Sequence, residues 1–250
     1  MTNKNAIRTA VVGVGYLGKF HAQKYAAIEN SQLIGVADNN IENAQRIAAE
    51  LGVEAFGDYK DLFGKIDAVS IVTPTTLHHK IAKEFLCQGI HVLVEKPITV
   101  TPEEARDLIS TAKEHNCILQ VGHLERFNAA MLDLDKVLLN PRFIEAHRLA
   151  PFKPRATDVD VILDLMIHDI DIILSTVRSE LINIDVSGTK VLSNSTDIAN
   201  ARLTFANGCV ANVTASRISL KSERKMRVFQ PDAYLSVDFQ NRIFSYHKKG

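Results

Sequence analysis

The stretch of sequence that decides the fold is AVVGVGYLGKFH, residues 10–21. It begins as a short apolar run, and Gly13, Gly15 and Gly18 then form the pattern GxGxxG where a helix is expected to start. Asp38 follows twenty residues after Gly18, at the end of the next apolar run. Glycines at these spacings allow a tight turn and let a pyrophosphate approach a helix N-terminus, and the carboxylate can accept hydrogen bonds from a ribose. The pattern predicts a dinucleotide site rather than a glycine-rich turn that binds something else.

The residues after Asp38 favour NAD over NADP. Two asparagines, Asn39 and Asn40, follow it, and no arginine is nearby. A carboxylate repels the 2′-phosphate of NADP, and an NADP site normally has a cation at this position. Besides the three glycines, we expect Tyr16 and Leu17 to line the cofactor at the start of the helix.

Outward from this stretch, the first half of the chain alternates strand-like and helix-like segments. The strand-like segments are short, and their residues are apolar at both alternating positions, as in strands covered on both faces. They are residues 10–13, 32–37, 68–72, 91–94 and 118–121. The amphipathic segments between them lie near residues 16–28, 41–51, 77–88 and 102–115. The last of these has Thr101 as a candidate N-cap and Glu104 three residues later. The alternation predicts a doubly wound parallel sheet, an N-terminal Rossmann domain of residues 1–122.

From about residue 123 the pattern changes. A helix near 128–139 and a strand near 142–149 are followed by a long helix near 161–177. Strand-like runs with an antiparallel pattern follow, at residues 182–192, 198–205, 209–217, 225–229 and 234–246. Ala206-Asn207-Gly208 supplies a hairpin turn between two of them. We therefore predict a second domain of class α+β over residues 123–250.

Composition argues against several function classes. Lys plus Arg (29) equals Asp plus Glu (29), so no net field attracts nucleic acid or an anionic membrane. The three cysteines are widely spaced and form no CxxC or Cys/His cluster, which argues against a disulfide framework or a zinc site. No apolar run approaches the ~20 residues of a membrane span, and the N-terminus lacks a secretory signal. We expect a cytoplasmic protein with no metal, nucleic-acid or membrane partner.

Two polar groups follow predicted parallel strands at their carboxyl ends, where ligands of open α/β sheets bind. The first consists of Thr73, Pro74, Thr76 and His78, and the second of Glu95, Lys96 and Pro97. We expect the first group, Glu95 and Lys96 to line the cofactor site. Lys96 would also hold a substrate hydroxyl and stabilise developing alkoxide charge. The alternative is that Glu95 and Lys96 form an ion pair at a solvated strand end. A catalytic role is not expected for His78 or His79.

The predicted helix near residues 161–177 has two stripes at helical spacing. Leu163, Ile167, Ile170, Leu174 and Val177 predict a core-facing stripe, and Asp164, His168, Asp171 and Ser175 a polar one. Asp164 lies one turn before His168 and can orient its imidazole. Taken alone, the polar stripe would be a solvent-facing surface; beside a nicotinamide site it favours a catalytic pair. Asp169 is off this stripe, so we expect a surface charge.

In combination and in this order, three motifs resemble the Gfo/Idh/MocA oxidoreductases: the glycine loop, Glu95-Lys96-Pro97, and Asp164 with His168. The resemblance implies that Lys96, Asp164 and His168 surround the nicotinamide and the reacting carbon, with His168 as proton acceptor. It implies a cis peptide bond between Lys96 and Pro97. It also implies an open, mostly antiparallel sheet in the second domain, through which a homo-oligomer (dimer or tetramer) forms. Family members continue past residue 250, so the second domain is either abbreviated or truncated at its C-terminus.

Residues 15–25, GYLGKFHAQKY, and 121–130, VGHLERFNAA, resemble the UDP-N-acetylglucosamine 3-dehydrogenase branch of that family, which belongs to lipid A biosynthesis. This likeness implies that Arg126 and Asn128 bind substrate beside Lys96, Asp164 and His168. Arg126 could equally be a surface cation. Family members often have proline after the asparagine, where this chain has Ala129.

The expected activity is NAD-dependent oxidation of a secondary hydroxyl on a sugar, the 3-OH of a UDP-linked N-acetylhexosamine. His168 would remove the hydroxyl proton as hydride leaves the carbon, and Lys96 would stabilise the oxygen. Two alternatives remain open: a dehydrogenase of a free sugar or a polyol such as an inositol, and a non-catalytic Rossmann protein that senses NAD or a sugar.

Overall fold

The computed structural model describes residues 6–152 and 159–250. The N-terminal segment that is expected to carry no secretory signal lies partly outside this range, at residues 1–5. The chain divides into two compact units, Met1–Gly122 and His123–Gly250. No helix in the described residues is long and apolar enough to cross a membrane. The same residues hold no group of three or more His, Cys, Asp or Glu side chains arranged for a metal.

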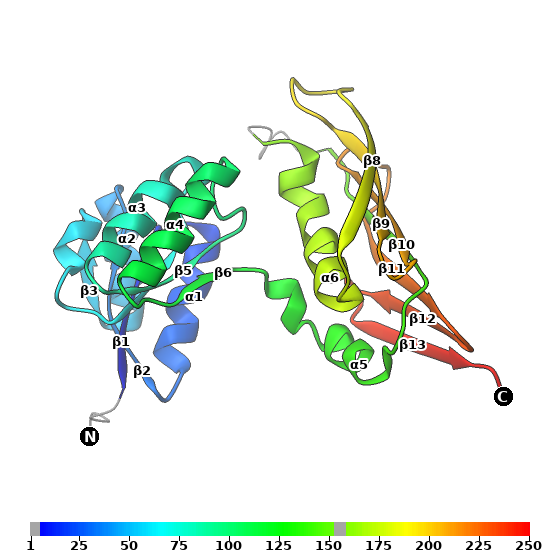
Figure 1. The fold of residues 1–250 in the computed structure, drawn as a ribbon. Helices are drawn as coiled ribbons and strands as arrows, with labels where there is room; N and C mark the ends of the chain where they lie inside the picture. Colours follow the sequence, from blue (N-terminus) through cyan, green and yellow to red (C-terminus); the bar gives the residue numbers. More distant parts are fainter. Residues whose placement is uncertain (1–5, 153–158) are drawn as a thin grey trace. The chain divides into compact units, whose positions relative to one another are not determined.

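The first unit is built on a six-stranded parallel sheet with the strand order β3-β2-β1-β4-β5-β6 (Figure 1). Its strands are β1 (Ile7–Val12), β2 (Ser31–Ala37), β3 (Glu54–Phe56), β4 (Ala68–Ile71), β5 (His91–Val94) and β6 (Leu119–Val121). Its helices are α1 (Tyr16–Ala27), α2 (Ile41–Leu51), α3 (Thr75–Cys87) and α4 (Pro102–Glu114), with a 3₁₀ turn η1 (Tyr59–Leu62). This order is that of a doubly wound dinucleotide-binding sheet, as predicted. Only the three-residue β3 had no counterpart among the predicted strands.

Both faces of this sheet are covered, which explains why its strands are apolar on both parities. In β1, Val11 packs in a cluster with Ala22 and Ile47 of α1 and α2. Its neighbour Val12 packs in another with residues of α3 and α4, among them Phe85. Since successive side chains of a strand point to opposite faces, α1 and α2 cover one face and α3 and α4 the other. The capping box of Thr101 and Glu104 starts α4 as predicted.

The second unit contains a seven-stranded sheet with the order β13-β12-β11-β7-β10-β9-β8. The strands are β7 (Phe143–Leu149), β8 (Leu181–Thr189), β9 (Ile198–Phe205), β10 (Val210–Ser216), β11 (Glu223–Gln230), β12 (Ala233–Asp238) and β13 (Ile243–Lys248). All neighbours pair antiparallel except β7 and β10, so the sheet is mixed but mostly antiparallel, as predicted. The predicted hairpin turn joins β9 and β10, with Gly208 at φ +82. The single strand predicted over residues 234–246 is instead two strands joined by a turn.

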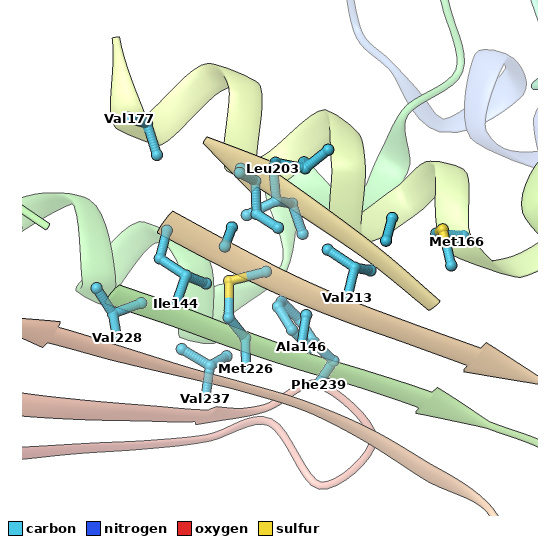
Figure 2. Close-up of a cluster of buried hydrophobic side chains, with 14 of the residues drawn as sticks. Ile144, Ala146, Met166, Val177, Leu203, Val213, Met226, Val228, Val237 and Phe239 are labelled. Atoms are coloured by element: carbon cyan, nitrogen blue, oxygen red, sulfur yellow. The ribbon is translucent and has the colours of Figure 1, made fainter. Parts of the chain in front are cut away.

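One face of this sheet carries the core of the unit (Figure 2). The helical elements are η2 (Leu124–Phe127), α5 (Ala129–Val137), the π-helix η3 (Ile162–Met166) and α6 (Ile167–Val177). Met166 and Val177 point from η3 and α6 toward the sheet, where Ile144 and Val213 are fully buried. The opposite face is mostly polar, as in the hydrogen bond between Asn200 and Thr214, with an aromatic group of Phe143, Phe229 and Tyr234.

The core-facing stripe predicted for the long helix is confirmed at Val177, which is buried, and at Ile170, which packs against the core, but it is wrong at Leu174, because the first turn of the helix is π-helical. The residues that are buried on the helix are Val161, Met166, Asp169, Ile172, Ile173 and Val177. The step of five from Val161 to Met166 is the π turn, which holds one residue more than an α turn and shifts the phase of everything after it. Leu174, predicted to face the core, is therefore 47% exposed.

Candidate active site

The glycine loop meets the demands of a dinucleotide cradle. Gly13 has φ +84, and a Cβ on it would lie 2.6 Å from the carbonyl oxygen of Val72. A Cβ on Gly18 would lie 1.8 Å from the carbonyl oxygen of Gly13, so α1 can approach the loop only without a side chain there. Gly15, the N-cap of α1, is different, because a Cβ on it would meet no described atom within 4 Å. The protein leaves this space open at a helix N-terminus, where a pyrophosphate binds favourably.

Asp38 is fixed against this loop by two backbone hydrogen bonds. Its carboxylate accepts from Val14 N at 2.9 Å and from Asn40 N at 2.9 Å. A carboxylate oxygen has two lone pairs, so each oxygen can still accept from a ribose hydroxyl. Asn40 caps α2, accepting from Glu42 N at 3.1 Å. The end of β2 is therefore tied to the glycine loop, and the contact of Asp38 with a ribose stays a prediction.

Thr73 and His78 organise the segment after β4. The Thr73 hydroxyl oxygen is buried and has no hydrogen-bond partner among the described residues, as expected of a group that a ligand satisfies. His78 is 1% exposed, with Nε2 2.8 Å from the Thr73 carbonyl and Nδ1 2.9 Å from the Pro97 carbonyl. Its ring links the segments that follow β4 and β5. The cofactor contacts expected for His78, Pro74 and Thr76 stay predictions.

Glu95 is an internal residue rather than part of a solvated strand end. It is 7% exposed, and its carboxylate lies 3.0 Å from His21 Nε2 of α1 and accepts from Lys96 N at 3.2 Å. Gly122 packs directly on it, since a Cβ there would lie 2.8 Å from Glu95 Oε1. The alternative of an exposed Glu95–Lys96 pair is therefore wrong for Glu95. The Lys96–Pro97 peptide bond is cis, as predicted.

In the second unit, Asp164 and His168 lie on consecutive turns of the long helix. Asp164 is in η3 and His168 in the first turn of α6, and both are partly buried. The start of the helix is fixed by Asp160, whose carboxylate accepts from Ile162 N at 3.1 Å and Leu163 N at 3.0 Å. The backbone that carries the two candidate catalytic side chains is thus capped at its N-terminus.

A buried ion pair that the sequence did not reveal supports the same helix start. Asp197 is fully buried and lies 2.8 Å from Arg217 Nε, and Arg217 Nη1 donates to Val159 O at 2.8 Å. Hydrogen bonds from the Ser193 hydroxyl, from backbone N–H groups and from Arg217 hold the pKa of Asp197 far below its usual range. Val161 N in turn donates to Thr196 O at 3.0 Å.

Asp169, predicted to be a surface charge, is instead 1% exposed. Arg148, which is 2% exposed, donates to it from Nε at 2.8 Å and from Nη2 at 2.9 Å. The prediction failed because the π turn rotates Asp169 inward and its partner is 21 residues away in sequence. In the sequence Asp169 stands between His168 and Ile170, with Asp171 close by, and nothing there marks it as the buried acid.

The predicted substrate residues Arg126 and Asn128 make contacts within the second unit. Arg126 forms a two-bond pair with Asp171, with Nε 2.6 Å from Oδ2. Asn128 caps α5 by accepting from Ala130 N at 3.2 Å, and its amide donates to Phe239 O at 3.3 Å. The Arg126 side chain is 50% exposed, so it is a surface cation that is paired with Asp171, and contact of either residue with substrate stays a prediction.

Taken together, the first unit gathers its predicted cofactor residues at one edge of the sheet. The glycine loop, Thr73 and Glu95 follow β1, β4 and β5, which are neighbours in the sheet. The open space at Gly15 and the buried hydroxyl of Thr73 fit a bound dinucleotide. The convergence of Lys96 with Asp164 and His168 stays a prediction.

Comparisons with known proteins agree with this geometry. Residues 7–123 match the model of the oxidoreductase family with an NAD-binding Rossmann fold, and residues 140–235 match the GFO/IDH/MocA C-terminal domain. The UDP-N-acetylglucosamine 3-dehydrogenase of Acidithiobacillus ferrooxidans is 46% identical, over 98% of this chain and 78% of its own length. The scyllo-inositol 2-dehydrogenase (NAD(+)) of Bacillus subtilis is 30% identical, over 86% of this chain and 69% of its own.

Solved structures give the same result. The A. ferrooxidans enzyme superposes with a TM-score of 0.93, covering 97% of this chain and 80% of that one. The apo scyllo-inositol dehydrogenase of Lactobacillus casei, at 25% identity, superposes with a TM-score of 0.82 over 95% of this chain and 76% of that one. This chain therefore belongs to the Gfo/Idh/MocA family of oxidoreductases, with the NAD-binding Rossmann fold of that family.

Proposed function

We propose that this chain is a UDP-N-acetylglucosamine 3-dehydrogenase, which oxidises the 3-hydroxyl of a UDP-linked N-acetylhexosamine with NAD as acceptor. The observation that supports the proposal most strongly is the 46% identity to the A. ferrooxidans enzyme over 98% of the chain. The second candidate substrate is a polyol of the inositol class, favoured by the 30% identity to the B. subtilis inositol enzyme.

In the proposed mechanism the two units have different tasks. Residues 1–122 bind the dinucleotide and residues 123–250 supply the proton acceptor. The glycine loop would hold NAD, which when bound would supply the acceptor for the hydride from the sugar carbon. His168 takes the hydroxyl proton, Asp164 orients its imidazole, and the Lys96 ammonium stabilises the oxygen while the carbonyl forms. An imidazole suits this task because its ordinary pKa of about 6.5 lies near the working pH.

The proposal extends to cellular context. A 3-keto sugar nucleotide is ready for amination, so we place the reaction before an aminotransferase, in lipid A biosynthesis in the cytoplasm. We also propose that the polar face of the seven-stranded sheet forms a homo-oligomer, a dimer or a tetramer. Size-exclusion chromatography with light scattering tests this part, and a monomer at micromolar concentration would contradict it.

The activity is tested by following NADH absorbance with UDP-N-acetylglucosamine, free N-acetylglucosamine and scyllo- and myo-inositol. We expect turnover with the sugar nucleotide and less than a tenth of that kcat/KM with the others. His168→Ala should lower kcat by ~10²–10⁴-fold, the usual contribution of a general base, with unchanged NAD affinity. His79→Ala is the matched control, because His79 lies on α3 and pairs with Asp107. Equal turnover of an inositol, or normal turnover by His168→Ala, would overturn the proposal.

A further inference from the structure

Helix α6 presents two aspartates close to His168, and each is held by an arginine through two bonds. Asp169 is bound by Arg148, whose Nε and Nη2 lie 2.8 and 2.9 Å from its oxygens. Asp171 is bound by Arg126 through Nε and Nη2. Such pairs fix direction as well as distance, because the planar guanidinium matches the two carboxylate oxygens.

The two pairs hold the helix from nearly opposite sides. Each α-helical residue turns about 100° around the axis, so Asp169 and Asp171 are separated by about 200°. Asp169 is held on the core side, where it is buried, and Asp171 on the side that is partly open. Because it is held on both sides, α6 cannot rotate about its axis without breaking at least one of these two ion pairs. The direction of His168 is fixed with it.

Both pairs lead back to one segment, residues 125–128. Glu125 Oε1 lies 3.4 Å from Arg148 Nη1, and Arg126 is the partner of Asp171. Asn128 donates to Phe239 O at 3.3 Å, and the Arg148 guanidinium lies 5.6 Å from the centre of the Phe239 ring. This short segment therefore takes part in both of the arginine pairs that hold α6.

We propose that Arg126 is a positioning residue, which acts through Asp171 to set the rotation of α6 and hence the direction of His168. The inference rests on the proposed role of His168. It is an alternative to the substrate contact expected for Arg126 from sequence, and it is favoured because the planar edge formed by Nε and Nη2 is already occupied by a carboxylate. His123 also lies close to the Asp171 carboxylate, with Nδ1 3.8 Å from Oδ2.

The test is a double-mutant cycle of Arg126→Ala, Asp171→Ala and both together, with kcat and KM measured for UDP-N-acetylglucosamine. A displacement of about 1 Å can cost roughly 100-fold in rate, so we expect each single change to lower kcat by about 10–100-fold. KM should change by less than about twofold, and the double variant should be no slower than the singles, because they break one contact. Arg126→Lys should rescue little, since lysine lacks the planar fork.

A substrate-binding Arg126 gives a different result. Arg126→Ala would then raise KM, Asp171→Ala would not, and the effects of the two changes would multiply; any of these outcomes overturns the proposal. Arg8→Ala is the matched control, because Arg8 also makes a two-bond pair, with Asp67, at the start of β1. It should leave kcat unchanged.

Hydrogen exchange separates this inference from the proposed activity. If the wild type turns over no UDP-N-acetylglucosamine, the proposed function fails. The effect of the Arg126–Asp171 pair on α6 can still be measured in that case. Arg126→Ala and Asp171→Ala should then speed amide exchange across residues 167–177 by the same factor, about tenfold, and Arg8→Ala should not. Unchanged exchange in α6 would overturn the positioning role.

Discussion

The two units hold their candidate site residues by different means. In the first, the glycine loop and its surroundings are constrained locally in sequence, since Gly18 packs on Gly13 and the His78 ring bonds a carbonyl five residues away, although Glu95 is held by the distant His21. In the second, ion pairs join distant segments, such as Arg126 with Asp171, 45 residues apart. A requirement on the backbone can be recognised in the sequence as a motif, whereas a long-range ion pair appears there only as two ordinary charged residues that are far apart.

The strongest test of the local constraint is Gly18→Ala. Its Cβ would stand 1.8 Å from the Gly13 carbonyl oxygen, so α1 must move away from the loop. Overpacking of this kind costs about 1–3 kcal/mol, and the displaced N-terminus of α1 is where the pyrophosphate would bind, so we expect NAD affinity, measured by calorimetry, to fall by roughly 10–100-fold. The Tm of Gly18→Ala should fall as well, whereas the Tm of the control Gly15→Ala, whose Cβ meets no described protein atom, should match the wild type. If Gly18→Ala bound NAD as tightly as the wild type, the close packing of Gly18 on Gly13 would not be a constraint on the cofactor site.

The corresponding test of the long-range constraint is Arg148→Met. It leaves the Asp169 carboxylate buried without its cation, which typically costs about 3–5 kcal/mol. Urea unfolding should show this loss, and adding Asp169→Leu should recover much of it, since an apolar pair of similar volume is tolerated. Arg106→Met removes an exposed partner of Glu103 and should cost less than about 0.5 kcal/mol. A loss as small in Arg148→Met would mean that the buried pair does not fix α6.

Acid should affect the second unit through Asp197. The pKa of this carboxyl is depressed in the folded state, first by the Ser193 hydroxyl, so the unfolded chain binds the proton more readily. The stability that results is present above the unfolded pKa of about 3.9 and is lost as pH falls below it. The difference in urea midpoint between the wild type and Asp197→Asn should therefore begin to narrow between pH 5 and pH 3 without closing, because the pKa in the folded state is much lower. Asp67→Asn, whose carboxylate is half-exposed beside Arg8, should show a smaller change, and parallel curves for Asp197→Asn would contradict the assignment.

The same contrast explains what could be predicted from sequence. The glycine loop, the capping box at Thr101 and the hairpin at Gly208 were predictable because each is decided within a few residues. The burial of Asp169 was not, because helical periodicity assumes 3.6 residues per turn and η3 has a wider one. The parallel pairing of β7 with β10 was also missed, since alternation of apolar residues indicates which face is buried but not which way the neighbour runs.

The smallest expected effect concerns Asp38, where backbone and charge act together. Its carboxylate anchors the glycine loop through Val14 N and would also repel the 2′-phosphate of NADP. Removing the charge should narrow the preference for NAD by about tenfold, or ~1.4 kcal/mol. Asp38→Asn separates the two roles, because its amide oxygen can still accept from Val14 N while the charge is gone. If repulsion sets the preference, the ratio of the two dissociation constants should shift equally in Asp38→Asn and Asp38→Ala. If the anchoring of the glycine loop sets the preference for NAD, only Asp38→Ala should shift this ratio. Equal binding of NAD and NADP by the wild type would contradict the preference itself.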